Sequence, residues 1–262
     1  MAGTAWIRDI EVVVFDVLGT LVDDVGGLRT AIREALSASA GAGAGAGAGG
    51  EGAASAAGDA ALDAYADELL GVWQQHVQLE EQRIGQGQRP YADTAVIDAE
   101  AARRVAGHAG IDDPAAVSRL ATTAQRLPPF GDSVAGLERL ARRLPVLALS
   151  NAGRTALLRL DAHAGLRWHQ TLSAETVQAY KPAPEVYRLA LDTAGCPPER
   201  ALMVAAHAWD LRGARANGMR TAYVHRPGGD PPTSADAFDL RFDAFDELVT
   251  ALTTTAADPR HR

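Results

Sequence analysis

Four short runs of branched and other apolar residues recur along the chain, and each has the length of a buried strand. They cover residues 11–16, 144–150, 201–207 and 219–225. Helical spacing of apolar residues, three and four apart, lies between and after these runs. It covers residues 133–144, 155–166, 184–195 and 209–218. Strands that alternate with helices predict an α/β fold with a parallel sheet covered on both faces.

Residues 23–130 break this alternation, because helical patterns follow one another there without a strand-like run between them. We therefore expect a mainly helical domain at 23–130, inserted into a core formed by residues 1–22 and 131–262. Within the insertion, Gly–Ala alternation over about 38–60 offers few side chains to bury and much backbone entropy to lose. This stretch predicts a flexible surface loop, with a silk-like strand as the alternative.

Composition excludes several classes of protein. The chain has 262 residues, 47% of them apolar, which is enough for a large domain with an inserted lobe. A net charge of −8 argues against nucleic-acid and anionic-membrane partners. The single cysteine, Cys196, excludes an intrachain disulfide and a cysteine-based metal cluster. Neither a signal peptide nor a membrane-spanning run is recognisable, so we expect a cytoplasmic protein.

Asp16 directly follows the first apolar run. An aspartate at the end of a strand is often only a turn residue or a helix cap. Gly19 and Thr20 favour a chemical role, because a tight loop there turns backbone N–H groups inward. Such a loop can hold a carboxylate beside an anion. Ligands also bind at the carboxyl ends of strands in parallel α/β folds.

Three further polar signals follow in a fixed order along the chain. Ser150 and Asn151 end the second strand, Lys181 precedes a helix, and Asp210 follows the third strand. Taken singly, they are equally well explained as a loop start, a solvated lysine and a first-turn acid. Lys181 is nevertheless the only lysine among 25 lysine and arginine residues. That favours a site where a compact point charge cannot be replaced by arginine.

Taken in order, these residues resemble the four motifs of the haloacid dehalogenase superfamily. The matching stretches are FDVLGTLVD (15–23), LSNAG (149–153), YKPAPEVY (180–187) and residues 203–228. The last stretch is most similar to the type II, or L-2-haloacid dehalogenase, branch. The resemblance implies a Rossmann-like three-layer core, with the helical insertion as a cap domain. It also implies a hydrolase that works through an aspartyl ester.

Two positions depart from the phosphatases of that superfamily. Leu18 stands where they carry the acid that protonates the leaving alcohol, and Ala206 where they carry an acid that helps to hold Mg²⁺. We therefore expect no metal and no cofactor, and attack of Asp16 at carbon rather than at phosphorus. Because a halide leaves without a proton, the resemblance implies hydrolysis of a short 2-haloacid to a 2-hydroxy acid.

The resemblance assigns roles to two sets of residues. Those implied in catalysis are Asp16, Thr20, Ser150, Lys181 and Asp210. Asp16 would be the nucleophile, Lys181 its counter-charge, and Asp210 a partner that helps to polarise the water; Thr20 and Ser150 would orient the Asp16 carboxylate. Those implied in binding a small carboxylate substrate are Leu18, Gln74, Asn151, Tyr187, His207 and Trp209. For His207 a satisfied strand-end histidine is the alternative, and for Trp209 packing under the cap hinge.

Two departures within the branch leave the substrate open. Leu18 replaces a tyrosine, and Gln74 stands where a cap arginine usually receives the halide; Arg83 or Arg89 could supply that charge instead. The alternatives are a hydrolase of another activated C–X bond or strained ring, and a phosphatase, which the two missing acids disfavour. A non-catalytic binding protein is disfavoured, because Asp16, Lys181 and Asp210 are all retained together. A homodimer is left open.

Overall fold

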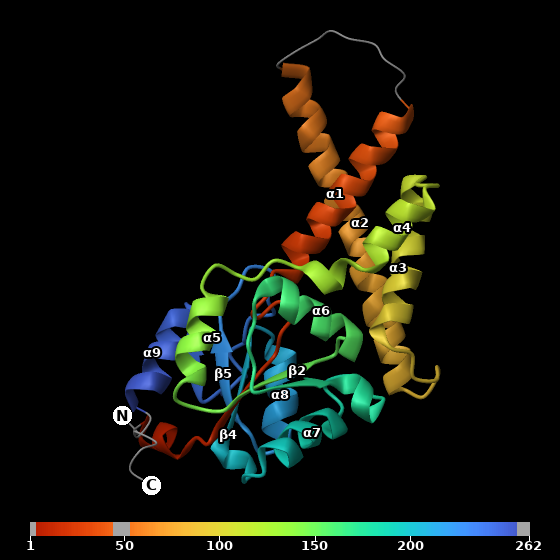
Figure 1. Cartoon of the computed structure of the whole chain (residues 1–262). Coiled ribbons are helices and arrows are strands. Elements are labelled where there is room, and N and C mark those ends of the chain that lie inside the picture. Colours follow the sequence, from red (N-terminus) through yellow and green to blue (C-terminus); the bar gives the residue numbers. More distant parts are fainter. Residues whose placement is uncertain (1–3, 44–52, 256–262) are drawn as a thin grey trace. The chain divides into compact units, whose positions relative to one another are not determined.

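The computed structural model describes residues 4–43 and 53–255. The chain divides into two compact units, one formed by Met1–Asp23 with Pro128–Arg262 and the other by Asp24–Leu127 (Figure 1). Each unit has its own hydrophobic core. Among the described residues, no helix combines the length and apolarity needed to cross a membrane.

A six-stranded sheet forms the centre of the first unit, and all of its neighbouring strands pair in parallel. In chain order the strands are β1 (Val12–Phe15), β2 (Val146–Ser150), β3 (Gln170–Ser173), β4 (Ala201–Ala205), β5 (Arg220–Val224) and β6 (Leu240–Phe242). Their order across the sheet is β3-β2-β1-β4-β5-β6, which places β1 between β2 and β4. The carboxyl ends of β1, β2 and β4 therefore lie side by side at the same end of the sheet.

Helices pack on both faces of this sheet, which confirms the predicted α/β class. They are α5 (Ser133–Ala141), α6 (Arg154–Ala164), α7 (Pro184–Ala194), α8 (Ala208–Ala216) and α9 (Phe245–Thr255), with 3₁₀ turns at Thr4–Asp9, Ala174–Val177 and Pro198–Arg200. Val12 and Val14 face a core cluster that includes residues of α7 and α8. Phe15 points to the other face, where its ring lies 5.8 Å from that of Phe245 on α9.

The second unit is helical in its described part. It contains α1 (Asp24–Gly43), α2 (Ala53–Gly85), α3 (Thr94–Ala109), α4 (Pro114–Ala121) and a 3₁₀ turn at Thr123–Arg126 (Figure 1). Its core is formed by apolar residues of all four helices, among them Ile32, Leu69, Trp73, Val105 and Leu120. Asp93 caps the start of α3 by accepting the N–H of Val96, and Gly110 ends that helix in the left-handed conformation.

The prediction of a flexible loop over about 38–60 is wrong for the residues that the structure describes there. Helix α1 continues to Gly43, and α2 begins at Ala53. Alanine is the strongest helix former, and glycine costs only about 1 kcal/mol more than alanine per residue. Alternating alanine is therefore compatible with the helical backbone seen at 38–43 and 53–60. Residues 44–52 lie outside the described residues.

Candidate active site

Asp16 follows the central strand, and its backbone N–H donates to the carbonyl of Val204 on β4 at 3.0 Å. The chain then turns tightly, with Gly19 at φ 73°. A side chain is unfavourable at that angle, so the turn depends on glycine. The turn brings Thr20 back over the strand end, where its hydroxyl donates to Asp16 Oδ2 at 2.8 Å. The Thr20 hydroxyl also accepts the N–H of Ala206 at 2.9 Å, which links β1 to the end of β4.

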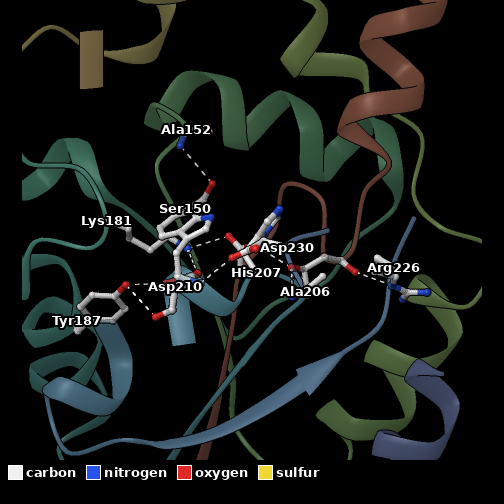
Figure 2. A network of polar contacts seen from close by, with 12 residues as sticks. Ser150, Ala152, Lys181, Tyr187, Ala206, His207, Asp210, Arg226 and Asp230 are labelled. Atoms are coloured by element: carbon white, nitrogen blue, oxygen red, sulfur yellow. Dashed lines mark hydrogen bonds and ion pairs between the residues drawn. The ribbon is translucent and has the colours of Figure 1, made fainter. Parts of the chain in front are cut away.

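Lys181 lies at the centre of the site. Its Nζ donates to Asp16 Oδ1 at 2.7 Å and to Asp210 Oδ2 at 2.6 Å, and its side chain is only 1% exposed (Figure 2). The backbone N–H of Lys181 donates to Asn151 Oδ1 at 2.8 Å, so the loop after β2 holds the lysine in place. The chain's only lysine is thus a buried point charge shared by two carboxylates.

Asp210 is fully buried in the first turn of α8. The hydroxyl of Tyr187 on α7 donates to Asp210 Oδ1 at 2.7 Å, leaving Oδ2 to Lys181. Tyr187 is expected from the sequence to bind substrate, but its side chain is fully buried behind Asp210 and orients that carboxylate instead. Gly213 makes room for this arrangement, because a Cβ there would lie 2.3 Å from the tyrosine hydroxyl.

The ionisation of the site follows from this geometry. Burial raises the pKa of Asp16, but Lys181 and His207 together outweigh it and hold that pKa below its ordinary value. Burial lowers the pKa of Lys181, but Asp16 and Asp210 outweigh it and raise that pKa. Burial, reinforced by Asp16, raises the pKa of Asp210 despite the lysine. Because one cation serves two buried carboxylates, the three groups titrate together and Asp16 carries the better stabilised charge.

His207 precedes α8, and its Nδ1 lies 3.2 Å from Asp16 Oδ2. Because an ionised carboxylate only accepts hydrogen bonds, the imidazole in this contact carries its proton on Nδ1. The His207 side chain is 17% exposed, so it reaches both Asp16 and the surface. Trp209 is 36% exposed, and its ring lies 5.9 Å from that of His207. Both residues therefore lie at the accessible side of Asp16 rather than behind it.

Two other predicted residues hold loops. Ser150 is buried, and its hydroxyl accepts the N–H of Ala152 at 3.2 Å, which shapes the loop that carries Asn151. Leu18 is half-buried in the turn after β1 and forms a parallel bridge with Val22. Neither Ser150 nor Leu18 carries a carboxyl group, so neither side chain can act as a second acid beside Asp16.

The loop after β5, at residues 226–230, also contributes to the site. Its first residues lie within the stretch 203–228, but no role for Arg226 or Asp230 is predicted from the sequence. Asp230 accepts the N–H groups of Ala208 and Trp209, through its carbonyl at 2.9 Å and its Oδ2 at 3.1 Å. Its own N–H donates to the carbonyl of Ala206 at 3.0 Å. Arg226 is buried and donates to the carbonyl of Thr20 at 2.9 Å (Figure 2). Charged residues in a Gly- and Pro-containing loop after a buried strand are the signal that could have found them.

The remaining predicted residues belong to the helical unit. Gln74 lies on α2 with an exposed side chain. Arg89 donates to Glu80 at 2.6 Å and to Glu100 at 2.8 Å, and Arg83 donates to the same Glu80 at 3.1 Å. Glu100 and Glu80 raise the pKa of Arg89, which keeps it charged. Because two carboxylates already pair with Arg89, its charge is largely neutralised within its own unit.

No three His, Cys, Asp or Glu side chains are grouped as metal ligands in the described part of the chain. Around Asp16 the charge is balanced by an ammonium group at 2.7 Å. The expectation that the reaction needs no metal remains a prediction.

The fold and the site together define an α/β enzyme whose polar centre is an Asp–Lys–Asp group at the carboxyl ends of parallel strands. A family model described as haloacid dehalogenase-like hydrolase matches residues 10–218. The chain belongs to this family of hydrolases, and its relatives place it in the L-2-haloacid dehalogenase branch.

Two curated relatives illustrate the similarity. The chain is 33% identical over 174 residues to an (S)-2-haloacid dehalogenase of Pseudomonas sp. (strain YL), covering 65% of this chain and 75% of the relative. It is 29% identical over 226 residues to (S)-2-haloacid dehalogenase H-109 of Pseudomonas putida, covering 85% of this chain and 88% of the relative.

Solved structures agree with these relatives. A crystal structure of an L-2-haloacid dehalogenase matches with a TM-score of 0.74 and 29% identity, covering 93% of this chain and 99% of the other. A crystal structure of a defluorinating L-2-haloacid dehalogenase matches with a TM-score of 0.76 and 25% identity, covering 96% and 98%.

Proposed function

We propose that the protein is a hydrolytic dehalogenase that converts a short (S)-2-haloacid into a 2-hydroxy acid. The observation that carries this proposal is the buried ion pair between Lys181 and Asp16, with Leu18 beside it in place of an acid. A carboxylate kept ionised and partly stripped of water is a competent nucleophile. The absence of an acid at residue 18 suits a leaving group that needs no proton.

In the first step, an oxygen of Asp16 forms a bond to C2 of the substrate while the carbon–halogen bond breaks. The halide leaves with the bonding electron pair, and no proton moves. Thr20 and Lys181 hold the Asp16 carboxylate in one orientation during the attack. Because the nucleophile enters opposite the leaving group, the configuration at C2 inverts.

In the second step, water attacks the carbonyl carbon of the Asp16 ester, and the bond from that carbon to the ester oxygen breaks. One proton of the water goes to the departing oxygen, which gives the 2-hydroxy acid, and the other is released to solvent as the Asp16 carboxylate is regenerated. Asp210, fixed by Lys181 and Tyr187, helps to polarise this water, and His207 positions it from the accessible side. Backbone N–H groups near Leu18 and Asn151 bind the substrate carboxylate. In the complete reaction, the oxygen of the new hydroxyl group on C2 comes from the Asp16 carboxylate.

The helical unit is proposed to act as the cap of this site. The identity of the halide-accepting group there is open, because Gln74 carries no charge and Arg89 is paired with two glutamates. A small carboxylate is the proposed partner of the protein, and the net charge of −8 supports the absence of nucleic-acid and membrane partners.

Single-turnover hydrolysis in ¹⁸O-labelled water tests the proposal. With (S)-2-chloropropionate we expect chloride release, a product of inverted configuration, and the label in Asp16 rather than in the first product formed. Asp16→Asn is expected to abolish chloride release, because an amide is a poor nucleophile, whereas Asp192→Asn, at an exposed position on α7, is not. Label in the first product with Asp16 unlabelled means direct attack by water and refutes the covalent mechanism.

A further inference from the structure

Arg226 is buried in the loop after β5 and contacts three separate parts of the first unit, one of which is α9, where the ring centroid of Phe245 lies 5.5 Å from the guanidinium. Its Nε donates to the carbonyl of Thr20 at 2.9 Å. Its two terminal nitrogens lie 2.9 and 2.8 Å from the two carboxylate oxygens of Asp132. The guanidinium also lies over the ring of Phe130, 4.6 Å from its centroid. A planar guanidinium group, with several N–H donors in fixed directions, suits a carbonyl, a carboxylate and a ring at the same time, and a lysine ammonium group does not.

Apart from Phe245, the residues that Arg226 contacts belong to two chain segments that run side by side. The first, at residues 20–23, follows the turn after β1, and the second, at residues 128–132, leads to the start of α5. The N–H of Asp23 donates to the carbonyl of Pro128 at 2.9 Å, and the N–H of Phe130 donates to the carbonyl of Leu21 at 3.1 Å. Arg226 therefore holds the first segment by a carbonyl and the second segment by a carboxylate and a ring.

Thr20 connects this arrangement to Asp16. Its hydroxyl lies between Asp16 Oδ2 and the N–H of Ala206, and its carbonyl accepts from Arg226. The peptide of Thr20 is thus fixed on one side and its hydroxyl on the other. If the carbonyl is released, Thr20 is still held by its N–H, which donates to Val17, and by its hydroxyl, but the direction of that hydroxyl toward the carboxylate is less firmly fixed.

We propose that Arg226 is a positioning residue for the reaction, acting through the peptide of Thr20 on the orientation of the Asp16 carboxylate. It touches neither the proposed nucleophile nor the groups that balance its charge. Its effect therefore falls on the rate of the attack rather than on substrate binding. This inference rests on the proposed function, since it concerns the same nucleophile.

A double-mutant cycle between Arg226 and Thr20 separates this role from a merely structural one. Arg226→Met removes the donors, Thr20→Val removes the hydroxyl but keeps the shape, and the third variant combines them. Arg226→Lys keeps a charge near Asp132 and serves if the methionine variant does not fold. The matched control is Arg139→Met, which removes a half-exposed arginine that pairs with Asp246 in the same unit.

We expect Arg226→Met to lower kcat about tenfold with KM changed less than about twofold, as for a loss of transition-state positioning. In the Thr20→Val background the same substitution should change kcat by less than about twofold, because the group it positions is already absent. Arg226→Lys should lie between wild type and Arg226→Met, and Arg139→Met should match wild type. Independent, multiplicative losses from Arg226→Met and Thr20→Val overturn the proposal, as does a change confined to KM.

The ¹³Cγ chemical shift of Asp16 at pH 7 gives a second readout that needs no turnover. Arg226→Met and Thr20→Val should move this shift in the same direction, and the double variant should match Thr20→Val. An unchanged shift in Arg226→Met refutes the inference even if the protein is an active dehalogenase. A wild-type protein that releases no halide, with the shifts changing as expected, refutes the proposed function and leaves the positioning role supported.

Discussion

Replacing Lys181 by methionine leaves two buried carboxylates without their counter-charge. In the native protein the Lys181 Nζ lies 2.7 Å from Asp16 and 2.6 Å from Asp210. At an effective dielectric constant of about 20, an ion pair at this distance is worth roughly 6 kcal/mol. The Lys181→Met variant does not lose this full free energy of unfolding, because one of the buried carboxylates can take up a proton instead. The loss of stability then equals the free energy of protonating that carboxylate, which depends on pH.

Protonating a carboxyl group with an ordinary pKa of about 3.9 costs roughly 4 kcal/mol at pH 7 and about 1.5 kcal/mol at pH 5. In Lys181→Met burial raises the pKa of at least one aspartate in the folded state above its unfolded value, so stability increases as pH falls. In the wild type the pKa of Asp16 is lowered, and its stabilisation is complete above the unfolded value and lost only as pH falls below it. The pKa of Asp210 is raised by burial in the wild type already, so the difference between the two proteins comes mainly from Asp16, which loses its cation in the variant. The stability defect of the variant should therefore shrink toward pH 5.

Urea unfolding followed by tryptophan fluorescence at pH 7 and pH 5 measures this difference. We expect a defect of about 4 kcal/mol at pH 7 that falls by roughly 2.5 kcal/mol at pH 5, and about a thousandfold loss of halide release at pH 7, the kinetic equivalent of the same energy. Arg188→Met, at an exposed position on α7, should change stability by less than about 0.5 kcal/mol. An equal defect at both pH values, or activity within tenfold of wild type, refutes the reasoning.

Two further predictions follow from the same site. Gly213→Ala brings a Cβ within 2.3 Å of the Tyr187 hydroxyl, so we expect a loss of roughly 1–3 kcal/mol in stability together with slower halide release. The control, Gly107→Ala, has nothing within 4 Å of the new Cβ and should not destabilise the protein. Equal melting temperatures for the two variants would contradict the steric argument. Because Leu18 and Ala206 stand where metal-dependent relatives carry acids, halide release should persist after incubation with EDTA, and loss of turnover that Mg²⁺ restores would show a metal requirement.

The strands that the sequence predicted are those whose apolar residues form a continuous buried run. β1, β2 and β4 are buried at every position, and β5 is buried at every position after Arg220, as expected for strands inside a parallel sheet. β3 and β6 lie at the two edges of the sheet, and β3 begins with an exposed glutamine while β6 has only three residues. Edge strands of this kind lack a hydrophobic pattern, so their presence depends on neighbours that the local sequence does not reveal.

The site could be predicted in outline because the carboxyl ends of parallel strands lie at the same end of the sheet. Asp16 and Asp210 come together for that reason, and Asn151, which follows β2, holds the backbone of Lys181 so that its side chain reaches both. The direction of a side chain within a helix is a different matter, since Tyr187 points at Asp210 only because Gly213 leaves room for it. The loop composition marks Arg226 as a candidate, but its contact with the backbone carbonyl of Thr20 cannot be predicted from the sequence.

The central position of β1 has a consequence for how the protein is made. β1 ends at Phe15, yet its two neighbours in the sheet begin only at Val146 and Ala201. During synthesis this apolar strand leaves the ribosome before both of its partners, while the helices that follow it form mainly local contacts and can fold early. The nascent chain therefore carries an unpaired hydrophobic strand until at least residues 146–150 have been made. A chaperone that covers this strand should raise the yield of active protein.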